Sequence, residues 1–150
     1  MLTTEKFDDF QFEVINVSIP GKPDLHITKN GITFTRRLVE DMGYPQFVIP
    51  MLDYSRKIFA LKICKVDNEH GMRFSKAKCD QRRAIQHYAG TIKHLLRGIM
   101  GNSWKDENRY YITGVWFSEE KAMLFDLNTA KELLPFRVEK ASYTESVIEH

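Results

Sequence analysis

Long apolar segments are missing from this sequence. Its longest apolar stretches, such as 47–52 and 58–61, fall far short of the roughly 20 residues that a membrane-spanning helix needs. Residues 1–10 hold three acidic side chains and no hydrophobic segment, which argues against a secretory signal or an acidic-poor transit peptide. We therefore expect a cytoplasmic protein that does not cross a membrane.

Cysteine is scarce, and the sequence motifs of common enzymes are absent. Cys64 and Cys79 are the only cysteines and form no Cys-x-x-Cys pair, so no disulfide framework is predicted. The sequence contains no Gly-x-Ser-x-Gly, His-Glu-x-x-His, phosphate loop or dinucleotide fingerprint. A catalytic set scattered along the chain is still compatible with the sequence, because a triad needs only spatial proximity. We expect a protein that is not an enzyme and that binds no cofactor.

The histidines do not form a metal-binding motif. His87 and His94 lie seven residues apart in a segment predicted to be helical, with Asp80 seven residues earlier. Seven helical residues rise by ~10 Å, too far for two side chains to share one tetrahedral metal easily. His26 and His70 have no motif neighbours, so no metal site is predicted.

The net charge of +2 is small, but the charge is unevenly distributed. Residues 71–105 contain eight basic side chains against one acidic side chain, whereas acidic side chains predominate on either side of this segment. Such a concentration is compatible with a surface that contacts phosphates. The alternative is a solvated helix face.

The length and composition are those of one domain of the α+β class. With 150 residues and 43% hydrophobic content, the chain can bury a single sizeable core. We expect residues 1–140 to form this domain. The polar residues 141–150 are predicted to be a flexible tail.

The first half of the chain predicts two β-hairpins around a short helix. Apolar alternation predicts a strand over 10–19, before Pro20 and Gly21 interrupt it. Lys29-Asn30-Gly31 predicts a hairpin turn between strands at 25–28 and 32–34. Thr35 is placed to cap a helix that continues through Met42. Residues 47–52 and 57–62 predict the second hairpin.

The second half predicts one long helix and a further pair of strands. Apolar residues recur at helical spacing over 80–100, and Gly101 follows them. Strands are predicted at 109–117 and 121–125. Asn128 is expected to cap a short helix that ends before Pro135.

The two halves resemble each other, which predicts an imperfect tandem repeat of β-hairpin, helix and β-hairpin over about 25–65 and 71–126. Residues 31–36 and 71–76 both read glycine, apolar, polar, phenylalanine, hydroxyl, basic. Residues 52–61 match residues 116–125 in the same way. The alternative is a coincidence between two common strand-turn-helix patterns.

Residues 25–62 carry a family resemblance. Ile27-Thr28-Lys29-Asn30-Gly31-Ile32-Thr33-Phe34, followed by a short helix that ends in Met42-Gly43, resembles the swapped-hairpin DNA-binding domain of AbrB-type regulators. A duplicated unit also resembles the MraZ branch, in which two such units share one chain. The resemblance implies a homodimer or ring that presents basic loop and strand residues to DNA.

The resemblance assigns Lys29 to the turn lysine of this family and places Arg36 and Arg37 at the helix start. The second copy offers Arg73, Lys76 and Lys78. The sequence departs from the family where Tyr44-Pro45-Gln46 replaces the Gly-Asp before the third strand. Asp80-Gln81-Arg82-Arg83 also differs from the MraZ Asp-x-x-x-Arg spacing.

Two functions follow as hypotheses. The first is a small dimeric DNA-binding protein, a transcriptional regulator that contacts phosphates through a basic face. Its candidate nucleic-acid-binding residues are Lys29, Arg36, Arg37, Arg73, Lys76, Lys78, Arg82 and Arg83.

The second hypothesis is a protein-interaction module, such as a phage or mobile-element inhibitor, anti-CRISPR-like, of a larger nucleic-acid-handling complex. Its motivation is the adjacent aromatic pairs Tyr110/Tyr111 and Trp116/Phe117, of which one member each can face outward from a strand. Salt dependence separates the two hypotheses, because phosphate binding weakens steeply with added salt.

Overall fold

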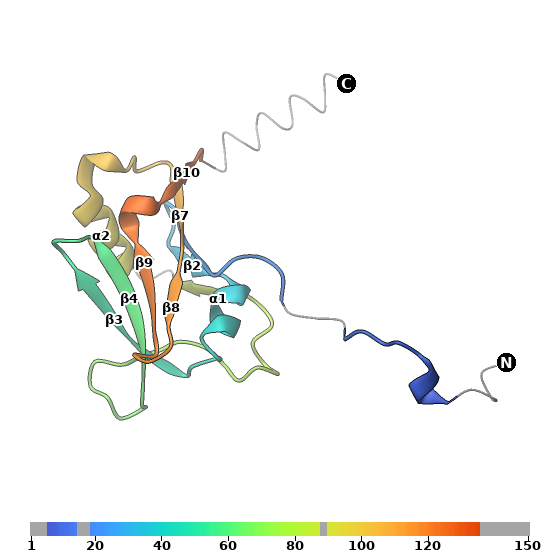
Figure 1. Ribbon diagram of the computed structural model, residues 1–150. Coiled ribbons are helices and arrows are strands. Elements are labelled where there is room, and N and C mark those ends of the chain that lie inside the picture. The colour runs from blue at the N-terminus through green and yellow to red at the C-terminus, as the bar shows by residue number, and fades with distance from the viewer. Residues whose placement is uncertain (1–5, 15–18, 88–89, 136–150) are drawn as a thin grey trace, which may run out of the picture.

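The computed structural model describes residues 6–14, 19–87 and 90–135, and it confirms the α+β class. Two antiparallel sheets of five strands each enclose a common core, with one main helix at the side (Figure 1). No helix in these residues is long and apolar enough to cross a bilayer.

The strands divide between the sheets in an order that differs from the chain order. Sheet A has the order β10 (Lys131–Leu133), β7 (Arg109–Thr113), β1 (Asp24–Ile27), β2 (Ile32–Phe34), β6 (Ile85–His87). Sheet B has the order β5 (Met72–Arg73), β3 (Phe47–Asp53), β4 (Ile58–Cys64), β9 (Ala122–Asp126), β8 (Val115–Phe117). The helices are α1 (Arg36–Asp41) and α2 (Gly90–Met100), with the 3-10 turns η2 (Phe7–Asp9), η3 (Gly101–Ser103) and η4 (Leu127–Thr129).

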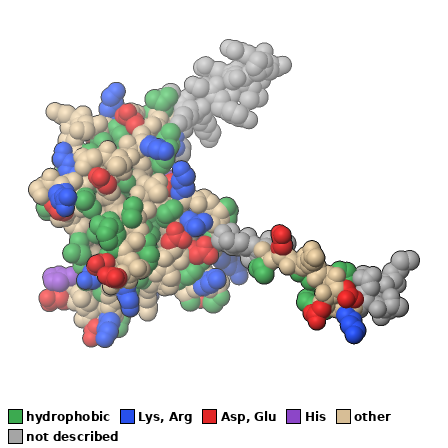
Figure 2. Space-filling model, viewed as in Figure 1, with side chains coloured by type: hydrophobic (Ala, Val, Ile, Leu, Met, Phe, Trp, Pro, Cys, Tyr) green, Lys and Arg blue, Asp and Glu red, His purple; other side chains and the backbone are tan. Residues whose placement is uncertain are grey.

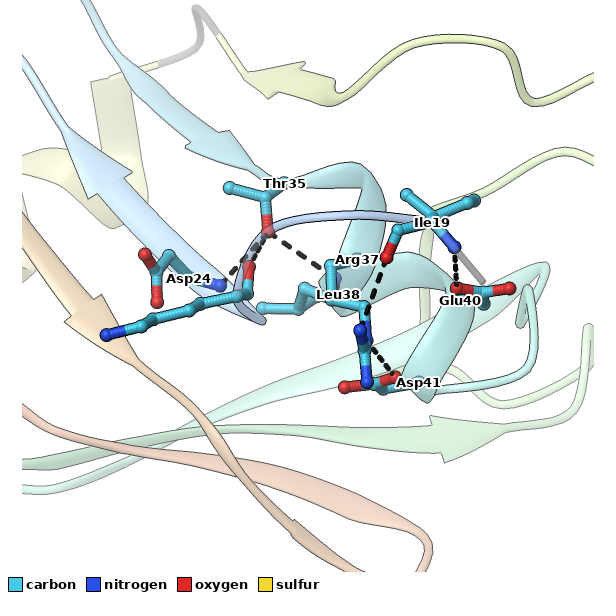
Figure 3. Close-up of polar contacts among 8 residues, drawn as sticks. Ile19, Asp24, Thr35, Arg37, Leu38, Glu40 and Asp41 are labelled. Atoms are coloured by element: carbon cyan, nitrogen blue, oxygen red, sulfur yellow. Dashed lines mark hydrogen bonds and ion pairs between the residues drawn. The ribbon is translucent and has the colours of Figure 1, made fainter. Parts of the chain in front are cut away.

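The predicted first hairpin and its capped helix are confirmed. The turn at 28–31 closes through the Thr28 amide, which donates to the Gly31 carbonyl at 2.9 Å. The Thr35 hydroxyl then accepts from the Leu38 amide at 3.4 Å, which satisfies one of the free donors at the start of α1. The same hydroxyl accepts from the Asp24 amide at 3.0 Å and so ties α1 to β1 (Figure 3).

The core lies between the inner faces of the two sheets. Alternate residues of β1 and β7 point inward, including the fully buried Leu25 and Ile112. Phe125 and Leu61 from sheet B meet them in the same cluster, and Leu96 of α2 covers one side. Burial of this apolar surface is the main favourable contribution to folding.

The predicted strand over 109–117 is interrupted at Gly114, where the chain passes from sheet A to sheet B. Its first part is β7 and its second part is β8. A Cβ atom at Gly114 would lie 2.8 Å from the Met123 sulfur and 2.9 Å from the Phe125 ring. The glycine therefore allows the backbone to approach the core closely at the corner between the sheets.

The long helix predicted over 80–100 is wrong in its first half. Among the described residues of this range, only Gly90–Met100 is helical, whereas Ile85–His87 forms β6 at the edge of sheet A. Ile85 pairs with Phe34 and is nearly buried there, so its apolar side chain contributes to the sheet instead of a helix stripe. Residues 74–84 form a loop.

Three further predictions need correction or lie outside the described residues. The described parts of the predicted strand 10–19 are Phe10 to Val14 and Ile19, and both lie outside any strand. Phe10 to Val14 are exposed. The helix expected at Asn128 is the 3-10 turn η4, capped by the Asp126 side chain, and it is followed by β10. The expected tail, 141–150, lies outside the residues that the structure describes.

The tandem repeat is not confirmed in the predicted register. Residues 32–34 form β2 and lead into α1, but residues 72–73 form β5 at the edge of the other sheet and lead into a loop. The last hairpins of the two halves, β3–β4 and β8–β9, are similar to each other. The turns at 53–57 and 117–121 both end in a lysine with positive φ, 59° at Lys57 and 53° at Lys121, and β4 pairs directly with β9.

Candidate phosphate-binding pocket

Four of the eight predicted basic residues line one pocket. Arg73, Lys76, Arg82 and Arg83 surround a cavity of about 820 Å³ between the 74–84 loop and the beginning of β3. Asp80 is the one acidic residue among the residues that line this cavity. We call this cavity the basic pocket.

The loop that forms the basic pocket is anchored to the core at its beginning. Phe74 is buried, and its ring meets Phe34 edge-on at a centroid distance of 5.2 Å. The next residue, Ser75, is buried and binds the Pro45 carbonyl twice, through its amide at 3.0 Å and its hydroxyl at 2.5 Å. These contacts continue the pairing of β3 with β5 beyond the regular strands. The beginning of the loop is therefore held in place against the core.

The far side of the loop is closed by one side chain. The Gln81 side-chain oxygen Oε1 accepts from the Lys76 backbone amide at 2.8 Å, and its side-chain nitrogen Nε2 donates to the Arg83 backbone carbonyl at 2.7 Å. The loop then returns to the core through Ile85 in β6. Gln81 therefore holds the two basic ends of the loop together.

The cationic groups of the basic pocket face solvent without a neutralising partner. Arg73, Lys76, Arg82 and Arg83 are exposed, and none forms an ion pair with another described residue. The Arg73 guanidinium lies 5.6 Å from the centre of the Phe47 ring, which orients it across the strand pair β3–β5. Such a set of free cations can bind phosphate oxygens.

The other four predicted residues do not line the basic pocket. Lys78 is in the same loop, exposed, and outside the pocket lining. Lys29 pairs with Glu107 at 3.3 Å and lines a different cavity beside α2. Arg37 is bound to Asp41 at 2.9 Å and to the Ile19 carbonyl at 3.2 Å (Figure 3), whereas Arg36 is exposed at the start of α1.

The basic side chains of α2 hold the structure together. Arg97 donates to the carbonyls of Lys105 and Asn108 at 3.1 and 3.0 Å and lies over the Tyr110 ring. Burial lowers the pKa of Arg97, and the attraction of Asp106 opposes this effect. Lys93 donates to the Lys29 carbonyl at 2.9 Å. These contacts explain the basic character of α2 without a ligand.

A second surface lies on the outside of sheet B. The register places Met51, Ala60, Leu124 and Val115 side by side across β3, β4, β9 and β8. Figure 2 shows hydrophobic side chains gathered over the face that β3, β4 and β9 occupy in Figure 1. The alternation of each strand contains this signal, but it becomes visible only once the order of the strands is known.

In each of the adjacent aromatic pairs, one side chain faces the core and the other faces outward, as expected for strands. Tyr110 is buried whereas Tyr111 is partly exposed, and Phe117 is exposed whereas Trp116 packs against the core. Trp104 is buried. Phe117 therefore belongs to the outer surface of sheet B.

The described histidines do not gather with other metal ligands. Within residues 6–14, 19–87 and 90–135, no group of three His, Cys, Asp or Glu side chains is placed to hold a metal ion. Burial lowers the pKa of His87 below its ordinary value. Burial also lowers the pKa of His26, against the opposing attraction of Asp24.

No protein-family model, no curated protein and no solved structure matches this chain. The resemblance of residues 25–62 to AbrB-type domains therefore stays a prediction.

Proposed function

We propose that this chain is a small cytoplasmic DNA-binding regulator that contacts the phosphate backbone through the basic pocket. The observation that carries this proposal is the convergence of four unpaired cationic side chains on one cavity with a single acidic neighbour. Arginine forks match phosphate oxygens bidentately, and a preformed arrangement lowers the entropy lost on binding. Phosphate contacts of this kind position a protein on DNA.

The arrangement supports a polyanion better than a small acidic metabolite. The basic residues are exposed, and Arg82 and Arg83 are neighbours in sequence, as they would be if they followed successive phosphates. Sequence-specific contacts would come from polar side chains beside them. Gln46 lines the pocket, is exposed, and is suited to hydrogen bond a base edge.

The test is fluorescence anisotropy of the purified full chain with a labelled random DNA duplex, at about 50 and about 200 mM salt. We expect micromolar binding at the lower concentration that weakens by orders of magnitude at the higher concentration. The variant Arg82→Ala/Arg83→Ala should bind more weakly and reduce the slope of log K against log salt by up to about 2, since each phosphate contact contributes about 0.9.

Lys22→Ala/Lys65→Ala is the matched control, because it removes the same number of charges at exposed basic residues outside the lining of the basic pocket. It should leave both the affinity and the salt slope close to those of the unmodified chain. No binding at low salt would refute the proposal. Equal losses in the control and the pocket variant would show that binding depends on overall charge alone.

A second candidate function is favoured by the outer surface of sheet B. Its exposed apolar residues are the kind of patch that marks a protein interface. In this case the chain would be a protein-interaction module, such as an inhibitor of a larger nucleic-acid-handling complex. A partner captured by the full chain and lost with Val115→Ser, but retained by Arg82→Ala/Arg83→Ala, would support this second function.

A further inference from the structure

The outer side of sheet B contains an apolar groove. Its cavity of about 540 Å³ is bounded by the strands β3, β4 and β9 and by Phe117 of β8. Met51 is 50% exposed and Phe117 is 42% exposed, although both are large apolar side chains. We call this cavity the outer groove. It is within the size range of cavities that accept ligands, large enough for aromatic side chains.

Charged side chains also line the outer groove. Lys62 of β4 is exposed and has Ile49 and Ala122 as its cross-strand neighbours. The part of the chain that the structure describes supplies it with no ion pair. Asp53, also in the groove lining, accepts instead from the Ser55 hydroxyl and the Arg56 amide of its own turn. The lining also holds Arg56 and Glu120, so its two basic and two acidic side chains balance and the rest of the lining is apolar. The outer groove therefore suits an apolar segment.

The chain itself contains such a segment. Residues 6–14, which we call the arm, read Lys6-Phe7-Asp8-Asp9-Phe10-Gln11-Phe12-Glu13-Val14, with three acidic side chains against one basic side chain. The three phenylalanine rings contact one another, with centroids 4.9 and 5.5 Å apart. They are nevertheless exposed, Phe12 at 67%.

The arm leaves the body of the molecule beside α1. Ile19, the first described residue after it, is held by Arg37 and Glu40 of that helix (Figure 3). Figure 1 shows the arm extending outward from this point, away from both sheets. The hydrogen bonds and ring contacts of residues 6–14 join them only to one another among the described residues. Its aromatic side chains are thus presented outward.

We propose that the arm of one protomer docks into the outer groove of a second copy of this chain, and that two copies exchange arms reciprocally. Phe10, Phe12 and Val14 alternate in sequence, so in an extended conformation they lie on one side and can contact the apolar groove together. A reciprocal exchange fills both grooves and closes the assembly at two copies.

The test is the mass of the full chain in solution, measured by sedimentation over roughly 1–100 μM protein, a range that covers micromolar dimer affinities. We expect a monomer–dimer equilibrium. Phe10→Ser/Phe12→Ser in the arm and Phe117→Ser/Leu124→Ser in the groove should each raise the dimer dissociation constant about tenfold or more, since apolar anchors dominate such interfaces. Circular dichroism verifies that each variant is folded.

Matched controls are available on both sides. Gln11→Ser lies between the two phenylalanines on the opposite side of an extended arm, and Val66→Ser removes a valine that is 69% exposed outside the groove lining. Both should dimerise as the unmodified chain does. An arm variant that dimerises normally, or an unmodified chain that stays monomeric at every concentration, would overturn the proposal.

Mixing distinguishes exchange between copies from docking within one chain. The arm variant keeps an intact groove and the groove variant keeps an intact arm. A mixture should therefore form one restored contact and yield heterodimers that exceed either homodimer. Absence of heterodimers would overturn reciprocal exchange, and association that disappears with added salt would assign the arm to the basic pocket. Because the two cavities share no lining residue, DNA binding and dimerisation can fail independently.

Discussion

The rings of Trp104 and Tyr110 are stacked, with centroids 4.5 Å apart and planes 9° from parallel. The Tyr110 hydroxyl accepts from the Lys105 amide at 2.6 Å and donates to Glu132 of β10 at 2.7 Å. The stack joins the segment after α2 to β7, and the Tyr110 hydroxyl extends the connection to β10 at the edge of sheet A. The hydrogen bonds from Asn108 and Tyr110 lower the pKa of Glu132, which keeps this acceptor ionised.

Tyr110→Phe should keep the stack and lose both hydroxyl contacts. We expect the free energy of unfolding to fall by about 1 kcal/mol, the usual contribution of such hydrogen bonds. Urea denaturation followed by circular dichroism measures this change. Tyr111→Phe, at the more exposed neighbour, should change the free energy of unfolding by less than about 0.5 kcal/mol. Equal effects would contradict the assigned role of the Tyr110 hydroxyl.

Gly114→Ala should destabilise the protein. A methyl group there would meet Met123 and Phe125 at distances under 3.0 Å, so the core must shift. Overpacking of this kind costs about 1–3 kcal/mol. Gly98→Ala, in α2, has open space around the new methyl group and should stabilise the helix by about 0.5–1 kcal/mol. Thermal melts of the two variants should therefore move in opposite directions.

The stability should decrease as the pH falls from about 7.5 to about 5.5, a window in which histidine titrates. Burial lowers the pKa of His26 and of His87 in the folded state. Below the ordinary pKa near 6.5 the unfolded chain then binds more protons than the folded chain, so stability is present above this value and is lost below it. His26→Gln/His87→Gln should flatten this dependence in urea denaturation. An unchanged slope would contradict the lowered pKa values.

Gln81→Ala should loosen the loop of the basic pocket without unfolding the domain. It removes the contacts to Lys76 and Arg83, both at exposed positions. Trypsin, which cleaves after lysine and arginine, should then cut the 76–83 segment faster, whereas the melting temperature should change little. On the proposed function, DNA affinity should also fall several-fold, because a less ordered loop loses more entropy on binding. A cleavage rate equal to that of the unmodified chain would contradict the bridging role.

Local signals in the sequence predicted much of the fold. The Asn30-Gly31 turn, the Thr35 cap and the hairpin from Phe47 to Cys64 depend on neighbouring residues, and the structure contains all three. The failures are of another kind. Ile85 fits a helix stripe by spacing, yet its partner is Phe34, far away in the sequence, and tertiary pairing decides its conformation.

The sequence predicted which kind of residue forms the candidate site, but not which of the basic residues lie together. The sequence indicated a basic segment, and four of its members line one pocket. It did not indicate that Lys29 would be paired with Glu107, since that contact joins residues 78 positions apart. The outer groove likewise depends on the order β3-β4-β9-β8, which no local pattern determines.

The passage of one continuous segment through Gly114 from β7 into β8 has a consequence for unfolding. We expect that neither sheet unfolds while the other stays folded, because the two sheets share this stretch of backbone and the core cluster packed around it. The protein should melt as one cooperative unit. Trp104, stacked on sheet A, and Trp116, in sheet B, would then report the same transition midpoint from opposite sides of the core.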